Sequence, residues 1–188
     1  MEKLTMQKAE QLLQETTTLP GLLQHALAVS ACMGAMARHF GADAAYWEAV
    51  GFLHDYDYQV YPDSHLHHTE QPLREAGVDE ESIRAILAHG WNVCNDVEPQ
   101  SDMEKSLFAV DAASGLVSAT AKMRPNGILD LTAASVAKKF KDKSFAANVS
   151  RETIQKGVEM LDIDRAALFA LCIEGMQPHA QKLGIGPK

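Results

Sequence analysis

The sequence has few of the features that mark secreted or membrane proteins. It holds only three cysteines among 188 residues, far apart and without CxxC spacing, so we expect free thiols in a reducing compartment rather than a disulfide framework. Its apolar runs fall short of the ~18 residues of a membrane-spanning helix. The stretch 1–18 carries Glu2, Glu10 and Glu15 and lacks the apolar centre of a signal peptide. We therefore expect a cytoplasmic protein without a membrane partner.

Basic residues are also scarce. Lysine and arginine number 17 against 25 aspartates and glutamates, and the formal net charge is −8. This balance argues against nucleic acid as a partner, because contacts from lysine and arginine to phosphate supply most of the affinity in such complexes. It does not exclude a small anionic substrate, since a bound divalent cation can dominate the local field.

Alternating strand-like patterns are weak everywhere, and helical spacing of apolar residues recurs along almost the whole chain. The expected fold is therefore all-α, a helical bundle formed by a single domain over 1–188 with its core at about 20–175. We expect helices over 5–16, 20–40, 43–53, 69–76, 79–89, 101–121, 130–140, 150–161 and 164–182.

Residues at the predicted helix ends support these boundaries. Pro20 suits a first helical position, and Gly41 suits a helix stop. Asp43 and Asp79 are plausible N-caps. The segment 56–69 combines tyrosine, proline, serine and histidine without a helical period, so we expect it to be a loop.

Three histidines lie on apolar faces of predicted helices. His25 aligns at helical spacing with Val29 and Cys32, and His54 and His89 lie on similar inward faces. One such histidine by itself is more often a hydrogen-bonded core residue than a ligand. Several of them, each presented by a different helix, match the way in which bundles assemble metal sites.

Asp111 is harder to explain as a core residue. It lies in the apolar stretch 107–117, and no lysine or arginine stands one helical turn away on either side. An ionised carboxylate buried without a partner costs several kcal/mol. Its partner should therefore be a metal or a basic group from elsewhere in the fold. Gly115, one turn on, would let another element approach closely.

The residue types limit the choice of ion. Imidazole with carboxylate suits Mn, Fe, Co, Ni or Zn, whereas Mg and Ca prefer oxygen ligands alone. The loop 64–68 adds three histidines. They are either a solvated cluster or the source of one further ligand, and spacing alone does not separate His65 from His68.

Several motifs occur together in a characteristic order. They are His25, the stretch 51–58 with the His54-Asp55 pair, Tyr61-Pro62 and His65, the stretch 85–90 with His89, the stretch 107–111 ending in Asp111, and the stretch 138–146. The series resembles the HD-domain superfamily of metal-dependent phosphohydrolases, and most closely a group of HDIG-type hydrolases. The resemblance covers about 20–175.

The resemblance implies an HD-domain helical bundle with four core metal ligands, His25, His54, Asp55 and Asp111. In superfamily members with two metals, further histidines complete the second site, and the matching positions here are His65 and His89. Asp55 would then bridge both ions. The chain lacks the GYP motif of the cyclic-dinucleotide branch, so the substrates of the better-known branches are not carried over.

The expected function is hydrolysis of a small phosphate ester, such as a nucleotide, by metal-activated water. Asp57 or His89 is the candidate to orient or deprotonate that water. Candidates for binding the substrate phosphate are Lys122, Arg124, Lys138 and Lys139, although a lysine run is more often a solvated helix face. Two alternatives remain: a di-iron oxygenase, because a branch of the superfamily uses the same six ligands for oxygen chemistry, and a non-catalytic metal- or nucleotide-binding sensor.

Overall fold

The computed structural model describes residues 3–188, and throughout this range the chain forms helices and loops without strands. This confirms the predicted all-α class. The α-helices are α1 (Met6–Thr16), α2 (Pro20–Phe40), α3 (Ala44–Leu53), α4 (Glu70–Glu75), α5 (Glu80–Ala88), α6 (Asp102–Lys122), α7 (Ala133–Lys141), α8 (Arg151–Leu161) and α9 (Arg165–Met176). Two short 3₁₀ helices, η1 (Pro62–Ser64) and η2 (Gln177–His179), accompany them.

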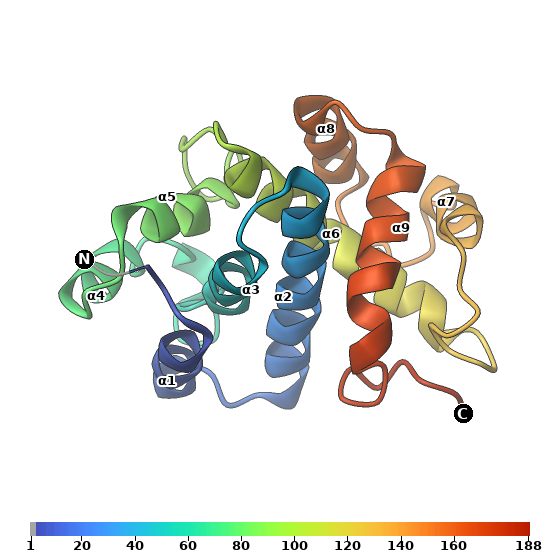
Figure 1. The fold of residues 1–188 in the computed structure, drawn as a ribbon, viewed down its shortest axis with the longest axis horizontal. Helices are drawn as coiled ribbons and strands as arrows, with labels where there is room; N and C mark the ends of the chain where they lie inside the picture. Colours follow the sequence, from blue (N-terminus) through green and yellow to red (C-terminus); the bar gives the residue numbers. More distant parts are fainter. Residues whose placement is uncertain (1–2) are drawn as a thin grey trace.

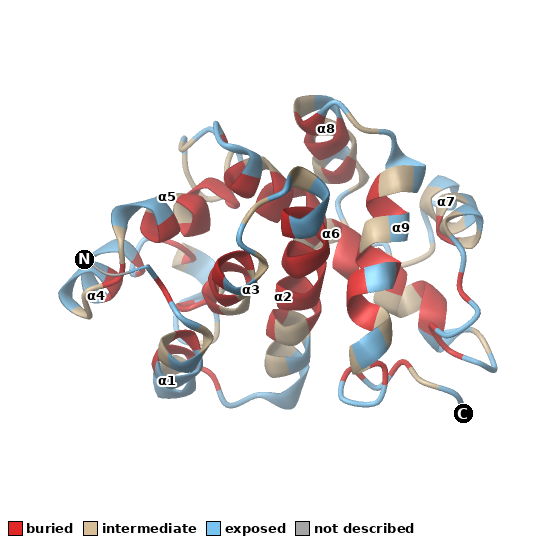
Figure 2. Cartoon of the chain, in the orientation of Figure 1, coloured by how far each residue is buried: buried red, intermediate tan, exposed pale blue. Residues whose placement is uncertain are grey.

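Helix α2 lies at the centre of the bundle and contacts α3, α6 and α9 (Figure 1). Its middle turns are buried on every side, whereas the outer helices bury one side and expose the other (Figure 2). Helix α6 passes behind α2 and also contacts α8, so residues of both long helices can meet in the interior. No helix within residues 3–188 has the length and apolar character needed to cross a bilayer.

Side-chain caps start most helices where the sequence predicts. The carboxylates of Asp43 and Asp79 accept hydrogen bonds from the backbone amides of Tyr46 and Ser82, which satisfies donors left free in the first turn. Helix α2 begins with Pro20 and ends at Gly41, which adopts a φ of 67°. This left-handed conformation costs glycine little.

The predicted helix over 164–182 is too long. Helix α9 ends at Met176, and the single 3₁₀ turn η2 follows it. Pro178 explains the early end, because it lacks the backbone N–H that a continuing α-helix needs and its ring clashes with the preceding turn. The segment 56–69, predicted to be a loop, also contains the short 3₁₀ helix η1, which begins at Pro62.

Helices α2 and α9 approach each other closely at one glycine. A methyl group added at Gly175 would overlap the backbone carbonyl of Ala31. This contact holds the C-terminal helix against the central helix, which also carries the first of the predicted site histidines.

Candidate metal centre

Two helices end in the same way, with a histidine at the C-cap. His54 follows α3 and His89 follows α5. The Nδ1 atom of His54 lies 2.8 Å from the carbonyl oxygen of Gly51, and that of His89 lies 2.6 Å from the carbonyl oxygen of Ile86. A carbonyl only accepts, so each Nδ1 carries the proton and donates it. Both Nε2 atoms keep their lone pairs, which is the tautomer that a metal ligand needs.

A first group of ligand atoms gathers around Asp111. His25 on α2 places its Nε2 2.9 Å from Asp111 Oδ1, and His54 Nε2 lies 3.6 Å from the same oxygen. Asp55 Oδ2 is 3.6 Å from His25 Nε2 and 3.4 Å from His54 Nε2. The carboxylate that the sequence left without a partner therefore meets basic groups from two other elements.

A second group forms on the other side of Asp55. Its Oδ1 atom lies 3.2 Å from His65 Nε2 and 3.6 Å from His89 Nε2. The two oxygens of Asp55 thus face different pairs of histidines. All six residues that the sequence places in a metal site come together, from α2, α6, the segment after η1, and the ends of α3 and α5.

Charges within the cluster shift the pKa values strongly. Burial lowers the pKa of His25, but the hydrogen bond and charge of Asp111 outweigh it and raise this pKa to about 9. His65 behaves alike: burial lowers its pKa, while Asp55 and Asp57 raise it to about 9. Burial would raise the pKa of Asp111, yet the contacts with His25 and His54 hold it far below its usual range. Positive charge is therefore favoured here.

The orientation of two imidazoles shows where that positive charge can lie. His65 donates from Nδ1 to Asp57 Oδ1 at 2.7 Å, and His89 donates from Nδ1 to a carbonyl. Their Nε2 atoms face each other at 3.2 Å. Two lone pairs would repel at this distance, so this contact suits either a proton on His65, in keeping with its raised pKa, or a metal ion bound by both nitrogens. The C-terminal ends of α3 and α5 add negative potential to the same place.

The donor set therefore fits a metal ion. Groups of three residues with ligand atoms within 4.8 Å of one another include His25, His54 and Asp55 as well as Asp55, His65 and His89. Imidazole nitrogens with carboxylate oxygens suit a divalent transition metal. These buried His and Asp groups could hold such an ion.

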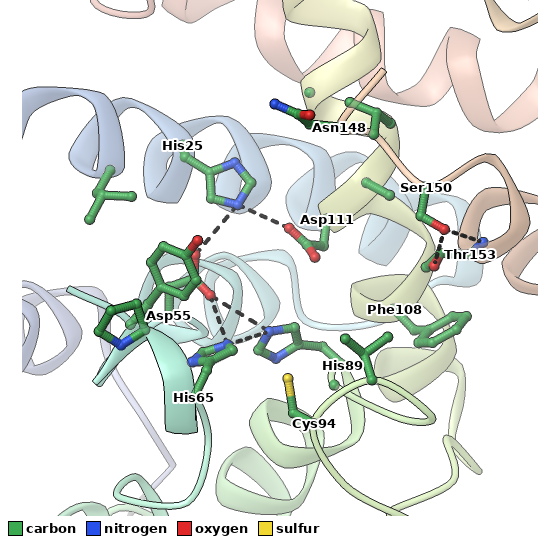
Figure 3. A pocket seen from close by; sticks show the side chains of 18 residues that line it. His25, Asp55, His65, His89, Cys94, Phe108, Asp111, Asn148, Ser150 and Thr153 are labelled. Atoms are coloured by element: carbon green, nitrogen blue, oxygen red, sulfur yellow. Dashed lines mark hydrogen bonds and ion pairs between the residues drawn. The ribbon is translucent and has the colours of Figure 1, made fainter. Parts of the chain in front are cut away.

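The cluster forms one wall of a cavity of about 530 Å³, shown in Figure 3. His25, Asp55, His65, His89 and Asp111 face this space, whereas His54 is fully buried behind them. The rest of the lining includes Phe108 from α6, Asn148 and Ser150 from the segment that leads into α8, and Thr153 in the first turn of α8. This volume is typical of a small-molecule site.

The structure separates the loop histidines that spacing did not. His65 is nearly buried and belongs to the cluster. His68 is exposed, stacks on Tyr61 with ring centroids 3.9 Å apart, and bonds to Ser64. The segment between η1 and α4 thus turns one histidine inward and leaves its neighbour at the surface.

Asp57 does not lie where a residue that orients or deprotonates the attacking water would lie. It is 1% exposed and does not line the cavity. Its Oδ1 accepts hydrogen bonds from His65 Nδ1 and the Leu66 amide, and its Oδ2 accepts one from the His68 amide. These bonds lower the pKa of Asp57, although burial alone would raise it. Asp57 therefore positions His65. Both ring nitrogens of His89 also have partners: Nδ1 donates to the Ile86 carbonyl, and Nε2 contacts His65 Nε2.

The four basic residues predicted to bind phosphate do not reach the cavity wall. Lys122, Arg124, Lys138 and Lys139 are absent from the residues that line it. Arg124 pairs with Asp130 at 2.8 Å, and the ammonium of Lys139 lies 4.5 Å from the ring centroid of Phe145. The cause is position. Lys122 and Arg124 lie three turns or more beyond Asp111, at about 1.5 Å per residue along α6, and Lys138 and Lys139 belong to α7, which adds no residue to the cavity lining.

Sequence reasoning missed the uncharged part of the cavity. Val93 and Cys94 come from the loop after α5, and Asn148 and Ser150 come from the segment that leads into α8. The start of α8 had a sequence signal, since Ser150 is a recognisable N-cap, and its hydroxyl accepts a hydrogen bond from the Thr153 amide. Gly115 carried a second sequence signal. Because glycine has no side chain, another element can approach it closely, and Val149 packs against it in the cavity wall.

Comparisons with known proteins identify no relative of this chain. A scan of protein-family models and searches of curated proteins and of solved structures each find no match.

Proposed function

We propose that the protein is a metal-dependent phosphohydrolase that cleaves a small phosphate ester. The observation that carries this proposal is the position of Asp55, whose two oxygens face two separate groups of histidines on the wall of a cavity. A carboxylate placed in this way suits a bridge between two divalent ions. Two-metal sites are common in enzymes that hydrolyse phosphate esters.

The ligands would divide into two sets that share Asp55. His25, His54 and Asp111 would hold one ion, and His65 and His89 would hold the other. Mn, Fe, Co, Ni and Zn suit this mixture of imidazole and carboxylate. When bound, such ions supply Lewis acidity, which polarises a phosphoryl oxygen and lowers the pKa of water. The order of the ligand residues along the chain supports the same proposal, because it resembles that of the HD-domain hydrolases.

The remaining residues have supporting tasks. Asp57 holds His65 in the orientation that points Nε2 at Asp55. The carbonyls of Gly51 and Ile86 do the same for His54 and His89. Phe108 and the other apolar residues of the cavity wall limit the water around the reacting phosphoryl group, which strengthens electrostatic interactions there.

The experiment is a phosphatase screen on protein loaded with Mn²⁺, Co²⁺ or Ni²⁺, paired with metal analysis. We expect phosphate release by the native chain and a loss of at least about 100-fold in Asp55→Ala, because both ligand groups lose an oxygen. Asp63→Ala, at an exposed aspartate on η1, is the matched control and should keep full activity.

A different outcome would favour the di-iron alternative. If folded, metal-replete protein releases no phosphate from any ester and the iron-loaded form gives a mixed-valent EPR signal, the hydrolase proposal fails. Tight binding of a nucleotide without turnover would instead favour a sensor.

A further inference from the structure

The cavity has one charged wall, and the rest of its lining is neutral. Among the lining residues within 3–188, none outside the ligand cluster is a lysine, arginine, aspartate or glutamate. The neutral part combines apolar side chains with a few hydroxyl and amide groups at the start of α8. Its main members are Leu22, Val93, Phe108, Asn148, Ser150 and Thr153.

The charge of the loaded cluster matches one phosphoryl group. Two divalent ions with the carboxylates of Asp55 and Asp111 leave two positive charges, because the imidazoles bind as neutral ligands. A phosphate monoester carries a charge of about −1.5 to −2 at pH 7. One such group therefore balances the site.

A further negative charge on the substrate would meet no cation in this cavity. The predicted phosphate-binding residues lie elsewhere, and Arg124 is already paired with Asp130. The net charge of −8 on the whole chain also disfavours a polyanion. Against this wall an unpaired carboxylate or second phosphate would lose water without gaining a side-chain cation. The N-terminus of α8 offers only the partial positive charge of its backbone amides.

The neutral wall offers apolar surface instead. Leu22 and Val93 present aliphatic groups, and the ring of Phe108, which is 3% exposed, forms a largely buried part of the same wall. Val93 is 81% exposed, so it leaves much apolar surface for a ligand to cover. Covering such surface favours binding roughly in proportion to the area removed from water.

Building on the proposed function, we infer that this cavity selects monoesters with a single phosphoryl group and an uncharged, largely apolar body. The metal cluster takes the phosphoryl group, and the wall from Phe108 to Val93 takes the body. Ser150, Thr153 and Asn148 offer hydrogen bonds to neutral polar groups on that body. Nucleoside di- and triphosphates, and esters with a carboxylate on the body, are disfavoured.

Binding of non-hydrolysable phosphonates tests this selectivity apart from turnover. Calorimetry on the Mn²⁺-loaded native chain compares methylphosphonate, phenylphosphonate and 4-carboxyphenylphosphonate. We expect phenylphosphonate to bind about tenfold more tightly than methylphosphonate, because its ring covers apolar wall. The added carboxylate should weaken binding by about tenfold, because it finds no cation. Equal affinities of the two aryl ligands, or no binding of either, would overturn the inference.

A variant that adds a cation makes the test sharper. Val93→Lys places this cation on the neutral wall at a position exposed enough to accept a lysine. The roughly tenfold preference for phenylphosphonate over 4-carboxyphenylphosphonate should then fall to about twofold or less, because the lysine pairs with the carboxylate while both ligands lose the apolar contact with Val93. Leu129→Lys is the control, since Leu129 is exposed but lies outside the cavity. An equal fall in this preference in both variants would overturn the inference, because overall charge would then explain it.

The two proposals can fail separately. If the protein hydrolyses esters but binds both aryl phosphonates equally, the inference on selectivity falls and the proposed hydrolase stands. If selective binding is found but no ester is cleaved under any metal, the proposed hydrolase falls, and the selectivity of the cavity stands.

Discussion

Individual residues around the cluster show how hydrogen bonds select the ligand form of histidine. Each of His54, His65 and His89 donates from Nδ1 to an acceptor within its own segment or close to it in the sequence. The acceptors are two backbone carbonyls and Asp57. Because the carbonyls are part of the helix ends, only the carboxylate can be changed by substitution.

Asp57→Asn tests this positioning role. The amide keeps the shape of the side chain but removes the charge that favours the Nδ1–H form of His65, so the divalent metal affinity of the His65 group should fall about 10- to 100-fold. Metal stoichiometry and competition with a chelating dye measure this loss. Asp63→Asn should bind metal like the native chain. Unchanged affinity in Asp57→Asn would remove Asp57 from any positioning role.

At the scale of elements, helix caps join distant parts of the chain. Asp79 caps α5, and its carboxylate also accepts hydrogen bonds from the Tyr46 hydroxyl at 2.7 Å and from the Leu4 amide at 3.0 Å. The same side chain therefore links α5, α3 and the segment before α1. Asp164 caps α9, but within residues 3–188 its carboxylate accepts a hydrogen bond from the Ala167 amide alone.

Asp79→Ala should accordingly cost about 2–3 kcal/mol of unfolding free energy at pH 7, against about 1 kcal/mol for the control Asp164→Ala. Burial would raise the pKa of Asp79, but its hydrogen bonds from Tyr46 and Ser82 lower it overall. Because the folded pKa is lowered, the charged form stabilises above the unfolded value of about 3.9, and this contribution is lost as the pH falls below it. Urea unfolding at pH 7 and pH 3 measures both effects; an undiminished difference at pH 3 would contradict this account.

The close crossing of α2 and α9 gives a second prediction at the scale of helices, on the stability of the fold. Gly175→Ala forces a methyl group against the Ala31 carbonyl and should destabilise the fold by about 1–3 kcal/mol. Gly21→Ala is the opposite control: it has no neighbour within 4 Å and should stabilise the chain by about 0.4–1 kcal/mol. Thermal unfolding of the two variants checks the signs. Equal shifts would show that the helix crossing is not close.

For the whole molecule, the candidate metal centre brings together residues from the helices that form the core. Its candidate ligands come from α2 and α6, from the ends of α3 and α5, and from the segment after η1. A ligand that binds only the folded state stabilises that state by mass action. A metal ion bound here should therefore stabilise the fold.

Chelation should lower the melting temperature. With free metal at 100 times its Kd the stabilisation is about 2.7 kcal/mol, so removal of the ion should lower the Tm by roughly 5–10 °C for a chain of this size. Differential scanning calorimetry with and without EDTA measures this shift. In Asp111→Asn the shift should be smaller, since this variant loses a ligand. An EDTA-independent Tm in the native chain would show that no metal stabilises the fold.

Much of the helical architecture was predictable because its signals are local. Pro20, Gly41 and the N-cap aspartates act within one turn, so they mark helix ends without knowledge of the fold. The error at the end of α9 also has a local cause, since Pro178 was available to indicate the break.

The candidate ligands were predictable for a related reason. An inward His25 or an isolated Asp111 in an apolar helix violates the usual pattern of a core, and such a violation is visible in the sequence. Their grouping into two sets around Asp55 depends on the rotation and crossing of four helices, which no local pattern specifies.

The sequence by itself therefore determined most of the helices, their caps and the inward positions of His25, His54, His89 and Asp111, because each depends on neighbours within a few positions. Tertiary structure alone decided that His65 rather than His68 turns inward, that Asp57 supports a histidine, and that the lysines lie away from the cavity. Packing of distant helices sets these outcomes. The neutral wall opposite His54-Asp55 arises in the same way, from segments far apart in the chain.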